Sequence, residues 1–336
     1  FGVVAKHSLE KTAAANYDCF TTVSNLTAKE CKYLLGKEVD LVTPNGFEDD
    51  FVPQGSAFTG KRKRARALML NVANKLLGTH MDDDTLIIGT SGRYEFKNKG
   101  IDVFLESLNR LNRDKDLQKN VLAFVNVPGW VGEPREDLQT RLKSKEKFDT
   151  PLEVPFITHW LHNMTHDQVL DMLKYLGMGN RPEDKVKVIF VPCYLDGKDG
   201  ILNKEYYDLI LGEDLSVYSS YYEPWGYTPL ESVAFRVPTI TTDLAGFGLW
   251  VNSLKNQHGI DNGVEVLHRS DYNYSEVADG IKDTIALFSG KTDNEVKEIR
   301  KQAAAVAEQA LWKHFIKYYY EAYDIALRNA MKRQLN

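Results

Sequence analysis

A repeated order of strand, glycine-containing turn and helix through the middle of the chain constrains its fold more than any other feature. Apolar runs that suit buried strands recur at 85–89, 121–127, 186–191, 215–218 and 237–242. Segments with apolar residues at helical spacing lie between them, at 102–111, 168–176 and 206–211. Such alternation predicts an α/β fold with a mostly parallel sheet covered on both faces, in which ligands bind at the carboxyl ends of the strands.

Composition excludes several classes of protein. The 336 residues include 42 Lys+Arg and 47 Asp+Glu, a net charge of −5 that argues against nucleic-acid binding. No apolar run approaches the roughly 18–20 residues of a membrane span. The three cysteines, Cys19, Cys31 and Cys193, are widely spaced and predict reduced thiols rather than a disulfide framework or a zinc site. We therefore expect a cytoplasmic protein that binds neither nucleic acid nor a membrane.

Two charged runs can each be interpreted as a binding site or as an ordinary surface segment. The basic run at 61–66 lies in a predicted helix over 56–80 and would suit a nucleic-acid patch, but no aromatic residue is interleaved with it. A solvated helix face is the favoured interpretation. Asp82 to Asp84 would suit a metal ion, yet they stand just before a predicted strand, where a polar turn is expected.

The two ends of the chain and one internal segment depart from the alternating pattern. Residues 1–55 predict a strand at 21–24, a capping box at 27–30 with a short helix, and a strand at 40–43. Residues 128–160 are charged and proline-rich, which indicates an insertion, and 294–331 predict one long helical stretch. The chain begins with Phe1 and has no signal-peptide pattern, so we expect processing or a longer parent protein.

The first candidate site segment follows the strand at 85–89. Ser91 to Gly100 supplies glycines that let backbone approach a ligand, together with the cations Arg93 and Lys99. Two fixed cations at this edge of the sheet suit a pyrophosphate. The alternative is an ordinary turn with basic residues on its surface.

The second candidate segment, 219–231, holds two carboxylates on either side of a turn-to-helix junction. Glu223 is expected on the loop and Glu231 inside the helix, with the backbone N–H groups of Gly226, Tyr227 and Thr228 at the helix start. Unpaired N–H groups and the helix dipole there favour an anion. A capping role for Glu231 is the alternative. A third glycine-containing turn at 243–248 is expected beside the same crevice.

These segments also carry a resemblance. Tyr221 to Glu231 reads Y-Y-E-P-W-G-Y-T-P-L-E, which resembles the E-x7-E motif of retaining glycosyltransferases with the GT-B fold and, in detail, glycogen synthases of the animal and fungal type. Gly92 to Gly100 and Thr242 to Gly248 resemble two further signatures of that family. Shorter matches lie at 20–24, 43–46 and 186–190, so the resemblance runs from about residue 10 to about residue 330.

The resemblance implies a reaction and a role for each matching residue. It implies transfer of glucose from UDP-glucose to the 4-hydroxyl of an α-1,4-glucan with retention, without a metal or other cofactor. Its implied catalytic residues are Glu223, Arg93 and Lys99. Its implied donor contacts are Glu231 on the ribose, Tyr206 and Tyr194 around the uracil, and Gly226, Tyr227 and Thr228 at the phosphates. Core packing is the alternative for the two tyrosines.

The resemblance also divides the chain. It implies that 1–55 end an N-terminal Rossmann-like domain, that 56–304 form the nucleotide-sugar-binding domain, and that a helix at 305–336 crosses back to the N-terminal domain. The rest of that domain is an expected partner, as is a second copy of the chain. Without it we expect weak UDP binding and little or no turnover.

One segment departs from the family pattern. The stretch 298–307 is mostly alanine where regulated family members carry an arginine-rich helix, which predicts the loss of control by glucose 6-phosphate. Two other functions stay open at this point: a related glycosyltransferase with another acceptor, and a non-catalytic nucleotide-sugar-binding module.

Overall fold

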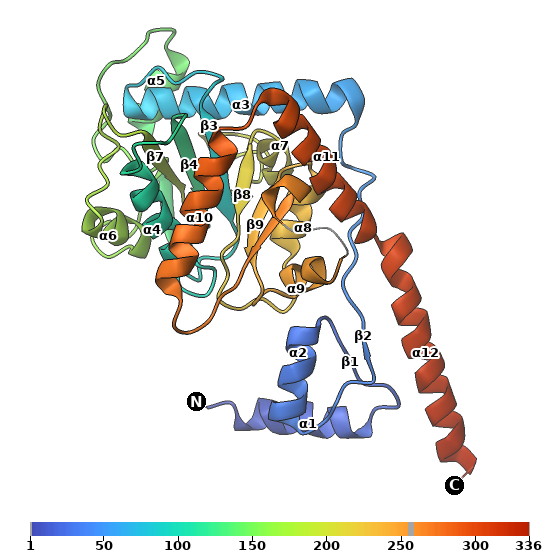
Figure 1. The fold of residues 1–336 in the computed structure, drawn as a ribbon. Coiled ribbons are helices and arrows are strands. Elements are labelled where there is room, and N and C mark those ends of the chain that lie inside the picture. The colour runs from blue at the N-terminus through green and yellow to red at the C-terminus, as the bar shows by residue number, and fades with distance from the viewer. Residues whose placement is uncertain (1, 255–258, 336) are drawn as a thin grey trace.

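A six-stranded parallel sheet forms the centre of the larger lobe (Figure 1). The computed structural model describes residues 2–254 and 259–335. The strand order is β10-β9-β8-β3-β4-β7. The strands are β3 (Leu86–Ser91), β4 (Val121–Asn126), β7 (Val186–Val191), β8 (Leu215–Val217), β9 (Thr239–Thr242) and β10 (Val264–Leu267). The α/β prediction is confirmed, with all five expected strands present; β10 was not predicted.

Side chains of the sheet alternate between two separate cores. In β3, Leu86 and Ile88 join the core under α4 (Ile101–Asn112) and α10 (Tyr274–Ser289). Ile87 joins the core under α3 (Gly55–Leu77) on the other face. Because both faces are covered, each strand is a nearly continuous apolar run rather than an alternating one.

The strand order fixes where a ligand can approach. From β3 the chain proceeds through β4 to β7 on one side, and then returns to β8, β9 and β10 on the other. The direction therefore reverses between β3 and β8, and a crevice opens outside the carboxyl ends of strands at such a point. Gly100, at the start of α4, has a φ of 67°, and a Cβ there would collide with the carbonyl of Ser219. This close approach brings the loops after β3 and β8 together.

The N-terminal lobe lies below the large domain in Figure 1. It contains α1 (Val4–Asn16), the parallel pair β1 (Thr21–Thr22) and β2 (Leu41–Val42), α2 (Asn25–Glu30), and a π-helical turn at Cys31–Leu35. The predicted capping box at 27–30 was wrong in position. Ser24 is the N-cap, and its hydroxyl accepts the N–H of Thr27, so α2 begins before Thr27 rather than after it.

The C-terminal stretch is two helices instead of the single one expected. These are α11 (Asp293–Gln309) and α12 (Trp312–Leu335). The chain leaves the helix between them because Phe47 takes part in backbone pairing, donating to Ala310 and accepting from Trp312. Residue 305, where the last segment was expected to start, therefore lies inside α11. α12 lies along the N-terminal lobe and contacts Asp18 there. Asn329 donates to the Asp18 carbonyl, and Arg333 pairs with the Asp18 carboxylate.

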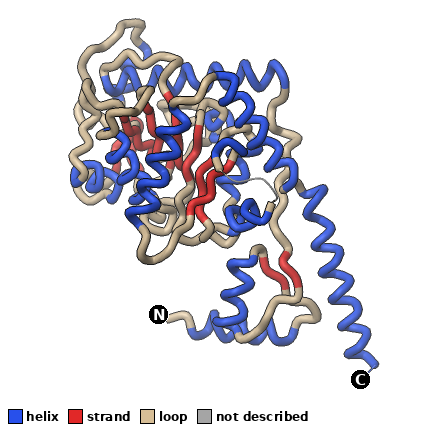
Figure 2. The backbone as a smooth tube through the Cα atoms, viewed as in Figure 1, coloured by secondary structure: helices blue, strands red, loops and turns tan. Residues whose placement is uncertain are grey.

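Shorter elements complete the domain. The segment predicted as an insertion forms β5 (Val131–Pro134), α5 (Glu136–Lys143) and β6 (His159–Leu161), and β5 pairs with β6 in antiparallel fashion. Figure 2 shows this pair and β1-β2 as strands outside the central sheet. The remaining helices are α6 (Gln168–Tyr175), α7 (Tyr206–Ile210), α8 (Tyr227–Ala234), α9 (Gly246–Ser253) and a 3₁₀ turn at Ile260–Asn262. Within the described ranges, no helix combines the length and apolar character needed to cross a membrane.

The basic run on α3 is only partly a solvated face, so the favoured interpretation was wrong for two of its residues. Arg62 and Arg66 point into the domain and pair with Asp214 at 2.5 and 2.6 Å. Lys63 and Arg64 are exposed. The two inward arginines occupy the amino-terminal edge of the sheet, and Arg66 also donates to the carbonyl oxygen of residue 85.

The segment 82–84 forms the polar turn that was favoured for it. The carbonyl of Asp82 accepts the N–H of Thr85, and its carboxylate accepts the N–H of Asp84. Asp84 also pairs with Lys119 at 2.8 Å.

Candidate functional site

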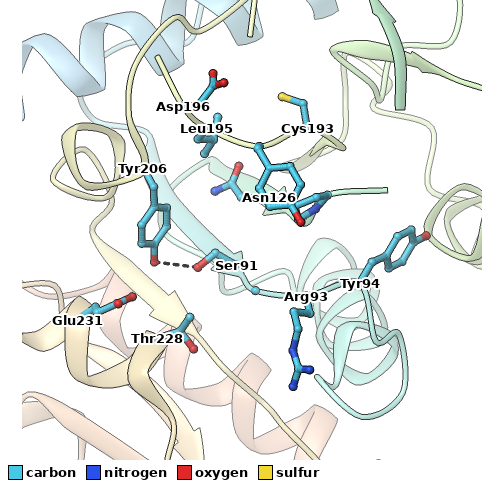
Figure 3. A pocket seen from close by; sticks show the side chains of 13 residues that line it. Ser91, Arg93, Tyr94, Asn126, Cys193, Leu195, Asp196, Tyr206, Thr228 and Glu231 are labelled. Carbon is cyan, nitrogen blue, oxygen red and sulfur yellow. Dashed lines mark hydrogen bonds between the residues drawn. The ribbon is translucent and has the colours of Figure 1, made fainter. Parts of the chain in front are cut away.

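A cavity of about 470 Å³ opens at the carboxyl ends of β3, β4 and β7, facing α7 and α8 (Figure 3). Five predicted site residues line it: Arg93, Tyr194, Tyr206, Thr228 and Glu231. They come from four separate segments of the chain. The strand-end rule had selected Arg93, Thr228 and Glu231, and the resemblance had added the two tyrosines.

The two tyrosines stand at different depths. The hydroxyl of Tyr206 is hydrogen-bonded to Ser91 Oγ at 2.8 Å and to the hydroxyl of Tyr218 at 3.3 Å. Burial raises the pKa of Tyr206 well above its ordinary value, so its hydroxyl stays neutral. Tyr194 is 76% exposed at the rim, so the core-packing alternative was wrong for this residue.

The start of α8 has the geometry expected for an anion site. Gly226 is the N-cap with a φ of 108°, and α8 begins at Tyr227. The first N–H groups of a helix have no partner within the helix, so those of Tyr227 and Thr228 are free of intrahelical bonds. Thr228 itself lines the cavity. A negatively charged group in the cavity would therefore meet N–H donors and the positive end of a helix dipole.

Glu231 lies one turn further along α8. Its carboxylate accepts a hydrogen bond from the hydroxyl of Tyr207 at 2.9 Å, and burial raises its pKa despite that bond. The capping alternative was wrong, because Gly226 is the N-cap and Glu231 binds another helix. Glu231 presents a half-buried acceptor to the cavity, which suits a ligand hydroxyl.

Four predicted site residues do not line the cavity: Lys99, Glu223, Gly226 and Tyr227. Two of them, Lys99 and Glu223, form an ion pair. Lys99 Nζ donates to Glu223 Oε2, and the two side chains are only 15% and 20% exposed. Glu223 is fixed by its backbone, which donates to Leu244 and accepts from Gly246, each at 3.0 Å. The turn at 243–248 therefore lies beside Glu223 and positions it, but it contributes no residue to the lining of the cavity.

The structure places the two predicted cations in different surroundings. Lys99 is held by Glu223, whereas Arg93 pairs with Glu95 at 3.0 Å and its side chain is 74% exposed. Figure 3 shows the guanidinium of Arg93 below the cavity, directed away from Cys193. Arg93 is thus an exposed charge that lines the cavity, and Lys99 is a largely buried one.

Sequence reasoning missed one wall of the cavity. Asn126, Cys193, Leu195 and Asp196 line it, and they stand at or just after the ends of β4 and β7. The strand-end rule could have found them, and the run of charges and glycines at 196–200 was a further signal. Burial raises the pKa of Cys193 to about 12, so this thiol is a neutral part of the wall.

One cluster has the residue types of a metal site. The ligand atoms of His159, Cys193 and Asp199 lie within 4.8 Å of one another. Both ring nitrogens of His159 are already hydrogen-bonded, to Thr158 Oγ1 at 2.8 Å and to the Asp199 carbonyl at 2.7 Å. The Asp199 carboxylate accepts the backbone N–H groups of residues 201, 202 and 203. The ligand atoms of His159 and Asp199 are therefore already engaged in holding this loop together.

Comparison with known proteins gives a consistent result. The family model described as Glycogen synthase matches residues 2–133 and 138–336. The chain is 27% identical to a glycogen [starch] synthase of Neurospora crassa over 100% of its length and 55% of that protein. It is 29% identical to glycogen [starch] synthase isoform 2 of Saccharomyces cerevisiae over 99% of its length and 56% of that protein. The chain thus spans about half the length of these curated relatives.

Solved structures share the fold. A sucrose-phosphate synthase from Thermosynechococcus elongatus matches with a TM-score of 0.54 and 17% identity, covering 98% of this chain and 61% of that one. WaaG, a glycosyltransferase of lipopolysaccharide biosynthesis, matches with a TM-score of 0.52 and 13% identity, covering 91% and 62%. At these identities the likeness shows the GT-B fold alone.

Proposed function

Because the chain belongs to the glycogen synthase family, we propose that it is the donor-binding half of a retaining glucosyltransferase. The reaction is transfer of glucose from UDP-glucose to the 4-hydroxyl of an α-1,4-glucan. The observation that carries the proposal is the gathering of five predicted residues around one 470 Å³ cavity at the carboxyl edge of the sheet. A volume of this size is within the roughly 300–1,000 Å³ usual for small-molecule sites.

The cavity has a suitable group for each part of the donor. The rings of Tyr194 and Tyr206 flank the uracil, and the Glu231 carboxylate accepts from the ribose hydroxyls. The phosphates lie at the start of α8, where the N–H groups of Tyr227 and Thr228 face them. Gly226 keeps that helix start open, since its φ of 108° disfavours a side chain.

The charges beside the cavity suit bond breaking. As the bond to the diphosphate breaks, negative charge grows on the leaving group and positive character on the sugar. Lys99, Arg93 and the α8 N-terminus stabilise the first, as preorganised electrostatics do. Glu223 stabilises the second. These groups supply the positive charge that the leaving diphosphate needs, so the proposal includes no metal.

The rest of the proposed enzyme lies outside this chain. We expect an N-terminal half, of the kind that the curated relatives carry, to supply most of the glucan-binding surface, and a second copy of the chain as a further partner. The exposed apolar residues of α12 suit such an assembly, for example Tyr320, Tyr323 and Leu327, which are 59–60% exposed. The proposed site of action is the cytoplasm.

The same proposal includes the loss of one form of control. Arg300 is buried and donates to the Glu213 carbonyl, while Lys301 pairs with Glu298 at 2.8 Å. Besides these two residues, Lys297 is the one further basic residue of α11, and this helix lacks an arginine cluster, so we expect no response to glucose 6-phosphate.

Two measurements test the proposal. Titration calorimetry of the chain with UDP measures donor binding, which Tyr206→Ala should weaken. Transfer of radiolabelled glucose from UDP-glucose to glycogen, with the N-terminal half supplied, should be lost in Glu223→Ala and in Arg93→Ala. Full transfer by Glu223→Ala would remove its catalytic role. UDP binding without transfer by the unsubstituted protein would favour a binding module or another acceptor.

A further inference from the structure

A second, smaller cavity lies on the far side of Tyr94 from the donor cavity. It measures about 240 Å³, and Tyr94 lines both cavities. Figure 3 shows the Tyr94 ring directed away from Tyr206 and Thr228. The two spaces therefore share one wall, and that wall belongs to the loop that carries Arg93 and Lys99.

The outer wall of the second cavity is an exposed aromatic platform. Trp130 lines the cavity and is 72% exposed. The ring of His162 lies 5.1 Å from that of Trp130. The backbone N–H of His162 donates to the carbonyl of Trp130 at 3.0 Å, which holds the two residues side by side at the base of the β5–β6 pair. An indole this exposed is uncommon in a folded protein and marks a surface for binding.

The polar groups of the cavity favour an uncharged ligand. Among the described lining residues there is no lysine or arginine, and the single carboxylate is that of Asp167. That carboxylate is already engaged, since it accepts from the Tyr94 hydroxyl at 2.8 Å and from the N–H groups of Val169 and Leu170. A phosphate would find no cation here. The side-chain amides of Asn163 and Gln168 offer neutral donors and acceptors instead, and the His166 ring lies beside them.

We propose that the Trp130 cavity is a second glucan subsite, which seats one sugar ring of the α-1,4-glucan next to the donor cavity. A pyranose presents a C–H face that packs on an indole, and its edge hydroxyls need neutral hydrogen-bond partners. The volume is below the roughly 300–1,000 Å³ of a site for a whole small molecule, as suits one ring of a polymer. The inference rests on the proposed function for the identity of the polymer.

Affinity electrophoresis of the full chain through gels that contain glycogen tests the subsite without any donor or transfer. We expect Trp130→Ala to weaken retardation by roughly tenfold, because an aromatic contact of this kind contributes on that scale. Trp130→Phe should retain part of the retardation. Tyr272→Ala removes an aromatic side chain that is 92% exposed and outside both cavities, and it should change nothing. Equal UDP binding by all variants checks that they are folded.

The outcomes separate this inference from the proposed function. Unchanged retardation of Trp130→Ala overturns the subsite, whatever the transfer assay shows. Loss of retardation supports it, even if the donor proves not to be UDP-glucose. Sedimentation of Trp130→Ala at rising concentration provides a second test. If the substitution abolishes self-association and leaves glycogen retardation intact, the platform is a contact between copies and the inference is wrong.

Discussion

The two edges of the central sheet both carry charged groups, but they use them differently. At the amino-terminal edge, Asp214 is buried against Arg62 and Arg66, and it also accepts the N–H of Ile87 in β3. At the carboxyl edge, Lys99 and Glu223 pair beside a cavity, and Arg93 is exposed. The first cluster has its charges balanced inside the domain, whereas the second keeps groups within reach of a ligand.

The pKa of Asp214 illustrates the difference. Burial alone would raise the pKa of this carboxyl, but the guanidinium groups of Arg62, Arg66 and Arg300 outweigh burial and lower it. The carboxyl therefore stays ionised and bound to its partners. A charge run in the sequence does not reveal which kind of edge it serves, because the partner is distant: Arg62 and Asp214 are 152 positions apart.

Replacement of Asp214 should produce the largest effect on folding. In Asp214→Ala the buried guanidinium groups lose their counter-ion, and breaking a buried pair of this kind costs about 3–5 kcal/mol of unfolding free energy. Denaturant titration of the chain measures this loss. UDP affinity measured on the folded fraction should be unchanged.

The matched control for that substitution is another aspartate paired with α3, this time from α7. Asp208 pairs with Lys61 at 2.9 Å, but both side chains are about two-fifths exposed. Asp208→Ala should cost at most about 1 kcal/mol, as for exposed ion pairs. If both variants lost the same free energy of unfolding, the buried cluster around Asp214 would contribute no more to stability than an exposed ion pair. The contrast between the two edges would then be wrong.

Replacement of Lys99 should give the opposite result. Lys99→Ala removes a fixed cation beside the proposed diphosphate, and loss of one such stabilising group slows catalysis by about 100- to 1,000-fold. The midpoint of thermal unfolding should fall less than in Asp214→Ala, because Lys99 has one ion-pair partner whereas Asp214 has two. Transfer of radiolabelled glucose, with the N-terminal half supplied, measures the effect. Lys97→Ala removes an exposed lysine of the same loop and should retain transfer; an equal loss there would point to loop disorder instead.

A pH titration sharpens the comparison through Glu213, which lies next to Asp214. Burial raises the pKa of Glu213 to about 8, although Ser216 donates to its carboxylate at 2.6 Å. In the unfolded chain the pKa is about 4.3, so between these values the folded state binds more protons. The free energy of unfolding therefore falls as the pH rises from about 4.3 to about 8, and no further change comes from this group above that.

Glu213→Gln should remove this pH dependence, because the amide does not titrate. Between pH 6 and pH 8 the unsubstituted chain should lose about 2 kcal/mol more unfolding free energy than the variant. Denaturant titrations of both proteins at the two pH values measure the difference. If the free energy of unfolding changed equally with pH in the two proteins, Glu213 would be ionised at both pH values. The buried carboxyl would then not be neutral in the folded protein.

The sequence pattern predicted those features of the molecule that depend on neighbouring residues in the chain. The strands β3, β4, β7 and β8 were found because each is a buried apolar run, and Thr228 and Glu231 because they follow a strand end. The break between α11 and α12 was not found, because it depends on backbone pairing with Phe47, far away in the sequence.

Long-range partners account for the other differences as well. Arg62 and Arg66 were assigned to a solvated face because a helix pattern does not show an acidic partner on another segment. The cavity wall at Asn126 and Cys193 follows from strand order, and a sequence with no observed topology does not show which strands are neighbours.

The smallest expected effect concerns the uncharged hydroxyl groups around Tyr206 at the carboxyl edge. Ser91 Oγ and the Tyr206 hydroxyl are 2.8 Å apart, and Tyr218 is the other hydroxyl near Tyr206, at 3.3 Å. Ser91→Ala removes the shorter bond and leaves the ring free to tilt in the cavity. A net hydrogen bond contributes about 1 kcal/mol, which corresponds to a roughly fivefold loss of UDP affinity in calorimetry. Tyr218→Phe removes the 3.3 Å bond to Tyr206 and a 3.5 Å bond from Ser91, and because both are long it should weaken UDP binding less. If Tyr218→Phe had the larger effect, the bond between Tyr206 and Tyr218, and not the bond to Ser91, would position the Tyr206 ring. The carboxyl edge would then depend on bonds between buried side chains, as the amino-terminal edge does.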